Sequence, residues 1–247
     1  MKIIFLGTNG FYDTKIGNTV CILIEAKNFN LILDAGNGIH KLNNYVDWKK
    51  PAFLFLSHLH LDHIFGLHIL TKFKFEKPLT IFTPKGTKKL LKFLINHPFT
   101  VPLENLPYKV QIKEIGQGRC FNPIKFEARY LLHAVPTLGF RFEIEKKKIV
   151  YCTDTGDCEN LRKLAKNAHF LILECALKPK QEMPHWPHLN PETAAKITKE
   201  ENAKKLFLTH FAANLYLKKS ERKKAEKVAR KIFKNTISAF DGLEITI

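Results

Sequence analysis

The chain has 247 residues, 45% of them hydrophobic, and a formal net charge of +17. This length fits one large domain or two small ones, and the hydrophobic content is ordinary for a globular protein. No apolar run approaches the roughly 18 residues of a membrane helix, and the apolar start MKIIFLG is too short for a signal-peptide core. We therefore expect a soluble, cytoplasmic protein with no membrane partner.

Five cysteines are scattered along the chain in no C-x-x-C pair, which argues against a disulfide framework and fits a reducing compartment. The positive charge favours a polyanionic partner, because Lys and Arg release counterions at a phosphate backbone. The alternative is a general abundance of lysine. Two basic stretches, 85–92 and 218–231, are expected to be solvated helix faces.

In chain order, short apolar runs bounded by turn residues predict strands. They lie at 2–6, 19–25, 30–34, 51–56, 78–84, 108–115, 121–132, 138–145, 148–153, 169–174 and 205–209. Helices are predicted at 36–47, 64–72, 86–96, 159–166, 191–200 and 219–233. In the third of these helices, the inward residues are expected to be Leu90, Leu91, Phe93, Leu94 and Ile95. This order suggests two mixed sheets packed face to face with helices outside, forming one domain over residues 1–247.

A histidine-rich segment, 57-SHLHLDH-63, follows the predicted strand at 51–56. His58, His60, Asp62 and His63 can all bind metal, and the loop after a buried strand is where α/β proteins place chemistry. Four ligands so close in sequence cannot comfortably close one tetrahedral site, but they could divide between two metals. Imidazole with carboxylate suits Zn²⁺, with Fe or Mn as alternatives.

Three more metal-capable side chains stand at the ends of later apolar runs. They are His133 after 128-ARYLL-132, Asp154 after 148-KIVYC-152 and His210 after 206-LFLT-209. Each is weak evidence alone. Together with the histidine-rich segment they indicate one convergent site.

These motifs resemble the metallo-β-lactamase superfamily, and within it the ribonuclease Z-like phosphodiesterase branch. The matching segments run in the expected order from 3-IIFLGTNG-10 and 31-LILDAGNG-38 through 57-SHLHLDH-63 to 133-HAVPTLGF-140, 151-YCTDTG-156, 188-HLNPETAA-195 and 208-LTHF-211. The resemblance implies an α/β fold, a four-layer αββα sandwich with a dinuclear site at one edge. It also implies a homodimer, as in many relatives.

The resemblance also assigns the ligands. The first metal would be held by His58, His60 and His133, the second by Asp62, His63 and His210, and Asp154 would bridge the two. Asp62 is therefore both a metal ligand and a catalytic residue in this assignment. Asp34 would orient the ligand loop from behind, as metal-bound histidines require.

Such a centre would act as a hydrolase with a metal-bridging hydroxide as the nucleophile, because two cations lower the pKa of a shared water towards ~7. His188 is the candidate general acid for the leaving group, with His185 as the alternative. Asp157 could compete with Asp154 as the bridging ligand. We expect Asp157 instead to cap the helix that follows.

The chain also departs from ribonuclease Z. In that enzyme a long arm that clamps tRNA usually lies between the positions matching His133 and Asp154. Here these residues are only 21 positions apart. The segments 188-HLNPE-192 and 211-FAANLY-216 also differ from the usual motifs. The metal site is therefore better supported than tRNA processing.

Three functions follow from these observations. We favour a dinuclear phosphodiesterase or nuclease acting on a phosphodiester such as RNA or a cyclic nucleotide. The alternative is a hydrolase of a carboxylic ester, thioester or lactam, since metals polarise a carbonyl equally well. A basic lining of the cleft would favour the first function and a neutral lining the second. A non-catalytic nucleic-acid-binding protein fits less well, because it needs no such ligand set.

Overall fold

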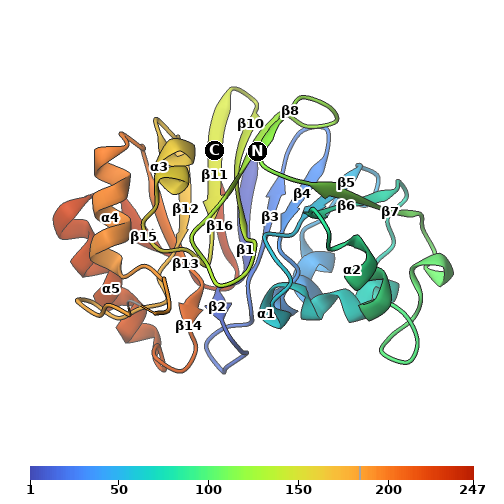
Figure 1. Cartoon of the computed structure of the whole chain (residues 1–247), viewed down its shortest axis with the longest axis horizontal. Coiled ribbons are helices and arrows are strands. Elements are labelled where there is room, and N and C mark those ends of the chain that lie inside the picture. The colour runs from blue at the N-terminus through green and yellow to red at the C-terminus, as the bar shows by residue number, and fades with distance from the viewer. Residues whose placement is uncertain (184) are drawn as a thin grey trace.

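The fold is seen in a computed structural model that describes residues 1–183 and 185–247. Two seven-stranded sheets pack face to face, and helices cover their outer surfaces (Figure 1). The four-layer αββα sandwich expected from the sequence is therefore confirmed.

The first sheet is built from the N-terminal half of the chain and closed by the last strand. In spatial order its strands are β16 (Leu243–Thr246), β1 (Lys2–Gly7), β3 (Cys21–Glu25), β4 (Asn30–Leu33), β5 (Ala52–Phe55), β6 (Leu79–Pro84) and β7 (Val110–Ile115). Pairing is antiparallel from β16 to β4 and parallel from β4 to β7.

The second sheet has the same division into a parallel and an antiparallel part. Its spatial order is β15 (Thr236–Ser238), β13 (Leu206–Thr209), β12 (Phe170–Glu174), β11 (Lys147–Cys152), β10 (Leu138–Ile144), β9 (Phe126–Tyr130) and β8 (Gly118–Cys120). Pairing is parallel from β15 to β11 and antiparallel from β11 to β8. A small parallel pair, β2 (Asn9–Gly10) with β14 (Phe211–Ala212), lies beside them.

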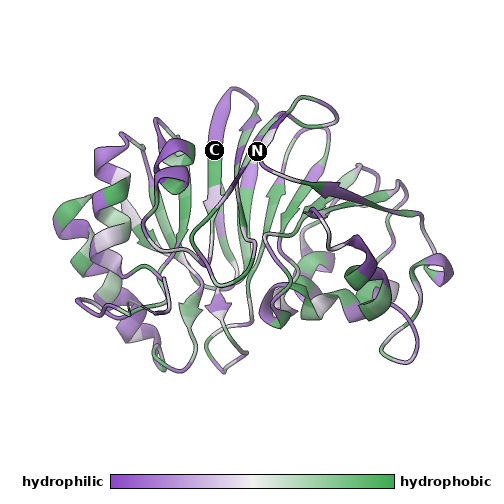
Figure 2. Ribbon diagram, viewed as in Figure 1, coloured by the Kyte–Doolittle hydropathy of each residue, from purple (hydrophilic) through white to green (hydrophobic). Residues whose placement is uncertain are grey.

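Both faces of the central strands are buried, which explains why their sequences are continuously apolar. In β1, Ile3 and Phe5 face the other sheet, whereas Ile4 and Leu6 face the helices. Successive strand side chains point to opposite faces, so a strand between two apolar layers needs apolar residues at every position. Figure 2 shows these strands as mainly hydrophobic.

The helices form the two outer layers. Over the first sheet lie the 3₁₀ helices η1 (Asn37–Asn44), η2 (Phe65–Lys72) and η3 (Leu103–Asn105) with the α-helices α1 (Leu61–Ile64) and α2 (Lys88–Leu94). Over the second sheet lie α3 (Glu159–Ala165), α4 (Pro191–Glu200) and α5 (Lys219–Ile232). Within the described ranges, no helix is both long and apolar enough to cross a membrane.

The outer layer of the first sheet differs from the sequence prediction. The segments predicted as helices at 36–47 and 64–72 are helical, mainly as 3₁₀ helices. On α2, Leu90 and Phe93 were expected to face inward, but both are exposed, and only Leu91 is buried within that helix. The prediction was wrong because α2 is only seven residues long and packs on the sheet along a narrow stripe.

Phe55 links the two sheets at the end of β5. Its ring lies 4.4 Å from the ring of Phe82 in the same sheet, and 4.9 to 5.3 Å from those of Phe126, Phe140 and Phe142 in the other sheet. Phe55 also lies two positions before the segment 57–63 that carries the histidines. The aromatic contacts therefore fix the position from which that segment begins.

We expect Phe55→Ala to lower the free energy of unfolding by about 3–5 kcal/mol, because it removes a fully buried ring and leaves a cavity. The matched control is Phe121→Ala, whose ring is 69% exposed and should contribute less than about 0.5 kcal/mol. Urea unfolding of both variants measures the difference. Equal losses of stability would contradict the proposed role of Phe55 at the sheet interface.

Candidate metal centre

The carboxyl ends of several strands meet at one edge of the sandwich. β4 and β5 run parallel, as do β11, β12 and β13, so the polar residues that follow them emerge on the same side. A hydrogen bond from the Leu138 amide to the Ser57 carbonyl, 2.9 Å long, joins the two sheets at this edge. The edge lies where α1, β2 and β14 are labelled in Figure 1.

The histidine-rich segment turns from strand to helix within a few residues. His58 and His60 follow β5, and His60, in extended conformation, occupies the N-cap position of α1. Asp62 and His63 belong to the single turn of α1, and His63 is fully buried. This sharp turn brings four metal-capable side chains of one segment into the same small volume.

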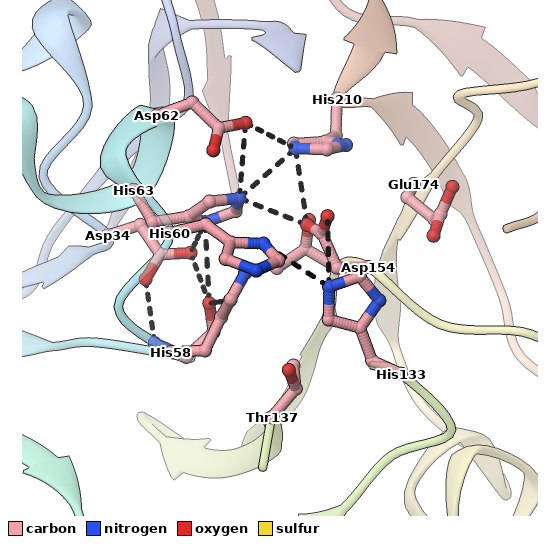
Figure 3. A network of polar contacts seen from close by, with 12 residues as sticks. Asp34, His58, His60, Asp62, His63, His133, Thr137, Asp154, Glu174 and His210 are labelled. Atoms are coloured by element: carbon pink, nitrogen blue, oxygen red, sulfur yellow. Dashed lines mark hydrogen bonds and ion pairs between the residues drawn. The ribbon is translucent and has the colours of Figure 1, made fainter. Parts of the chain in front are cut away.

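The seven side chains expected from the sequence all gather at this edge, in two groups (Figure 3). His58, His60, His133 and Asp154 form one group, and Asp62, His63 and His210 form the other, each with its ligand atoms within 4.8 Å of one another. The grouping coincides with the division that the resemblance implied.

Asp154 lies between the two groups. Its Oδ2 atom is 3.0 Å from Nε2 of His63 and 3.2 Å from Nε2 of His210, while its Oδ1 atom is 4.0 Å from Nε2 of His133. The two oxygens of one carboxylate therefore face different groups, as a bridging ligand requires.

The hydrogen bonds behind two histidines direct their Nε2 atoms into the site. Nδ1 of His63 donates to Asp34 at 2.8 Å, and Nδ1 of His58 lies 3.0 Å from the Ser57 hydroxyl, which itself donates to Asp34. Nε2 of His58 is buried and has no hydrogen-bond partner among the described residues. An orphaned imidazole nitrogen is costly in a protein interior unless it binds a ligand, so these residues fit a divalent metal.

Asp34 contacts the histidine-rich segment from behind, as expected from the sequence. This fully buried carboxylate also accepts hydrogen bonds from the Ser57 amide at 2.7 Å and from the Tyr151 hydroxyl at 2.6 Å. Tyr151 comes from the second sheet, so Asp34 connects the ligand segment to both sheets.

Three residues of the site have left-handed backbone conformations. The φ angles are +55° at Asp34, +49° at Asp154 and +51° at His210, each just after a strand. Asp and His tolerate this region better than most residues, but the conformation is held by its surroundings. Beside His210, a Cβ atom at position 10 would lie 2.4 Å from the histidine ring, so Gly10 cannot be replaced without a clash.

Charge and burial set the protonation of the cluster. Burial lowers the pKa of His58 and His133, which favours the neutral form that binds metal. Burial would lower the pKa of His63 as well, but the carboxylates of Asp62, Asp154 and Asp34 outweigh it and raise this pKa well above 6.5. A cation at this point would take the place of the proton on His63.

A second buried carboxylate, Glu174, was missed in the sequence analysis. It ends β12 and accepts hydrogen bonds from the Thr155 amide at 2.6 Å and from Nδ1 of His188 at 2.7 Å. Burial opposes protonation of His188, but the charge of Glu174 prevails and raises its pKa to about 9. The sequence did contain a signal, because 170-FLILE-174 ends in an acid as 30-NLILD-34 does.

The two remaining candidates do not join the cluster. His185 is exposed. Asp157 points away and pairs with Arg162 at 2.6 Å. The expectation that Asp157 caps the following helix was wrong, because Cys158 occupies the N-cap position of α3 and no side chain caps it. The Asp157 carboxylate forms the ion pair with Arg162 instead.

A pocket of about 310 Å³ opens onto the cluster. Among its described lining residues are ligand-capable side chains, His188, and the largely apolar Phe11, Leu177, Met183, Trp186 and Leu215. None of these lining residues is Lys or Arg. The cleft next to the cluster is thus neutral to acidic despite the net charge of +17.

Comparison with known proteins places this geometry in a family. Residues 30–211, more than half of the chain, match the family described as "Beta-lactamase superfamily domain". The chain belongs to this superfamily. Members that it resembles include ribonuclease Z from Bacillus licheniformis, which is 27% identical over 307 residues covering 99% of this chain and 98% of the relative.

Solved structures show that the superfamily fold extends over the whole chain. The metallo-beta-lactamase fold protein YhfI from Bacillus subtilis has a TM-score of 0.81 at 23% identity and covers 99% of both chains. The short form of human tRNase Z has a TM-score of 0.78 at 23% identity, covering 100% of this chain and 99% of the other. At these identities the likeness concerns the fold.

The chain is shorter than the ribonuclease Z that it resembles. The aligned stretch is 307 residues long, whereas this chain has 247, so at least 60 positions have no counterpart here. Between His133 and Asp154 the structure contains only the hairpin of β10 and β11. The strand pair expected from their spacing of 21 positions is confirmed.

We expect His188 to stabilise the metal-free protein in a pH-dependent way. Its pKa rises from 6.5 to about 9 on folding, so its contribution is complete below pH 6.5 and is lost as the pH rises through about 9. Urea unfolding of wild type and His188→Gln should differ by at most about 3 kcal/mol at low pH, and the gap should close at high pH.

The partner residue supplies the control for this measurement. In a Glu174→Gln background, the His188→Gln change should have little pH dependence, because the charge that raises the pKa is gone. A stability gap that stays constant across this pH range in wild type would contradict the ion pair.

Proposed function

We propose that the chain is a dinuclear metal-dependent hydrolase of phosphodiesters, with RNA or a cyclic nucleotide as the substrate class. The observation that carries the proposal is the pair of ligand groups that share Asp154. The similarity to ribonuclease Z over nearly the whole chain supports phosphodiesters as the substrate.

In this proposal, His58, His60 and His133 hold one cation, Asp62, His63 and His210 hold the other, and Asp154 contacts both. The nitrogen and oxygen donors suit Zn²⁺, with Mn or Fe as alternatives. Two bound cations supply a nucleophilic water of lowered pKa and neutralise charge that develops on the phosphoryl group.

Asp62 has a second role in this arrangement. Its Oδ2 atom lies 3.3 Å from Nε2 of His210 and accepts the amide of Phe11 at 2.7 Å. Asp62 thereby fixes the loop that follows β2 against the metal centre. Changes at this residue should therefore affect both the ligand set and the wall of the pocket.

His188 is proposed to donate a proton to the leaving oxygen. Glu174 holds its Nδ1 atom, which leaves Nε2 available on the pocket side, and His188 lines the pocket together with Asp154 and His210. In the metal-free protein the charge of Glu174 raises the pKa of His188 to about 9, which favours the protonated form that a general acid needs. His185 is exposed and is the weaker candidate for this role.

A hydrolase of a carboxylic ester, thioester or lactam is the second candidate. The observation in its favour is the lining of the pocket, where no Lys or Arg stands among the described residues. A neutral lining would suit these substrates. We favour phosphodiesters because metal cations can themselves hold a phosphodiester charge, so no lysine is required next to them.

We expect Zn²⁺- or Mn²⁺-loaded protein to bind about two ions per chain and to hydrolyse bis-p-nitrophenyl phosphate. Asp154→Asn should lower turnover at least about 100-fold and reduce the metal content, because it weakens the contact shared by both groups. Elemental analysis and absorbance of released nitrophenol measure the two effects.

Asp157→Asn is the matched control, since it changes a neighbouring aspartate that pairs with Arg162 outside the cluster. It should retain both metals and near wild-type turnover. Two metals without phosphodiester hydrolysis, combined with turnover of p-nitrophenyl acetate or an acyl thioester, would reject the first proposal in favour of the second.

A further inference from the structure

Two aromatic side chains line the pocket beside the cluster without belonging to the core. Trp186 is 47% exposed and Phe11 is 68% exposed, although both are large and apolar. Exposed aromatic surface costs solvation free energy, and at the mouth of a pocket it usually marks a binding surface. Neither residue has a part in the hydrolytic chemistry proposed above.

Trp186 stands next to both the ligand cluster and the proposed acid. The centre of its ring lies 6.1 Å from that of His133 and 6.0 Å from that of His188. A flat group resting on this indole would therefore lie beside both the ligand cluster and the proposed acid.

Phe11 is held at the pocket in a strained conformation. Its φ angle is +79°, a value that bulky residues rarely adopt because it strains the backbone. The hydrogen bond of 2.7 Å from its amide to Asp62 offsets this strain and ties its position to the cluster. Such strain at a pocket wall suggests that the position of the ring serves binding.

The charge of the pocket indicates what kind of group it receives. Apart from His188 and the ligand-capable residues, its described lining has no ionised side chain. A second phosphate or a carboxylate would find no Lys or Arg there to pair with, whereas a neutral planar ring would find two aromatic walls.

We propose that this pocket binds the nucleobase next to the scissile phosphodiester, stacked on Trp186 with Phe11 as a second wall. This inference rests on the proposed function and makes it more specific, because it assigns a nucleotide substrate and names its specificity-determining residues. Base stacking on an aromatic side chain contributes about 1–3 kcal/mol, which corresponds to roughly 5- to 150-fold in affinity.

The test compares two ligands that differ only in the base. Binding of AMP and of ribose 5-phosphate to Zn²⁺-loaded protein is measured by calorimetry, and AMP is expected to bind at least about 5-fold more tightly. Trp186→Ala should abolish this preference and leave the affinity for ribose 5-phosphate unchanged. Trp186→Phe, which keeps a flat ring, should retain much of the preference and shows that the site remains folded.

Fluorescence gives an independent readout, because the chain has only two tryptophans. In a Trp48→Phe variant, AMP should quench the emission of Trp186, while ribose 5-phosphate should not. Trp186→Phe provides the control, because it leaves only Trp48, which packs against Phe73 and Phe75 and is not among the described residues that line the pocket.

Equal affinity for the two ligands, or an AMP preference that survives Trp186→Ala, would overturn the inference. Both measurements record binding without turnover, so they are separate from the test of hydrolysis. A base preference without phosphodiester hydrolysis would support the pocket and reject the proposed reaction. Hydrolysis of bis-p-nitrophenyl phosphate without a base preference would support the proposed reaction and reject the nucleobase pocket.

Discussion

The buried carboxylate of Asp34 is the constraint on which the arrangement of this site depends. It accepts hydrogen bonds from the Ser57 amide, the Ser57 hydroxyl, the Tyr151 hydroxyl and His63, and so joins both sheets to the ligand segment. A fully buried carboxylate that lost these donors would be strongly destabilised. Its need for partners therefore fixes the direction in which His58 and His63 present their Nε2 atoms.

The net charge of the chain and the charge of its pocket suggest different kinds of ligand. The net charge of +17 suggests a polyanionic partner, yet the described residues that line the pocket include no Lys or Arg. If the cations of the proposed centre hold the phosphoryl group, the protein needs to supply only proton transfer from His188 and an apolar surface beside it. Trp186 and Phe11 provide that surface. The lysines thus lie outside the described lining of this pocket, where they contribute long-range attraction of polyanions.

Much of the fold and the seven-residue cluster could be predicted because their signals are local. Strands buried on both faces give continuous apolar runs, and a ligand at the end of such a run, such as His210 after LFLT, is visible in sequence. Glu174 was missed because its partner His188 lies fourteen residues away, and only the fold brings the two together. Leu90 and Phe93 were misplaced because periodicity cannot show how narrow the contact of a short helix is. Strand β16 was missed because its pairing with β1 joins opposite ends of the chain.

The central claim is that two cations share Asp154 between the two groups of ligands. Diffraction from crystals of Zn²⁺-loaded protein, recorded on both sides of the zinc absorption edge, tests it directly. The account predicts two anomalous peaks about 3.5–4 Å apart, one beside His58, His60 and His133 and the other beside Asp62, His63 and His210, with Asp154 in contact with both. A single peak, or peaks that Asp154 does not contact, would contradict it.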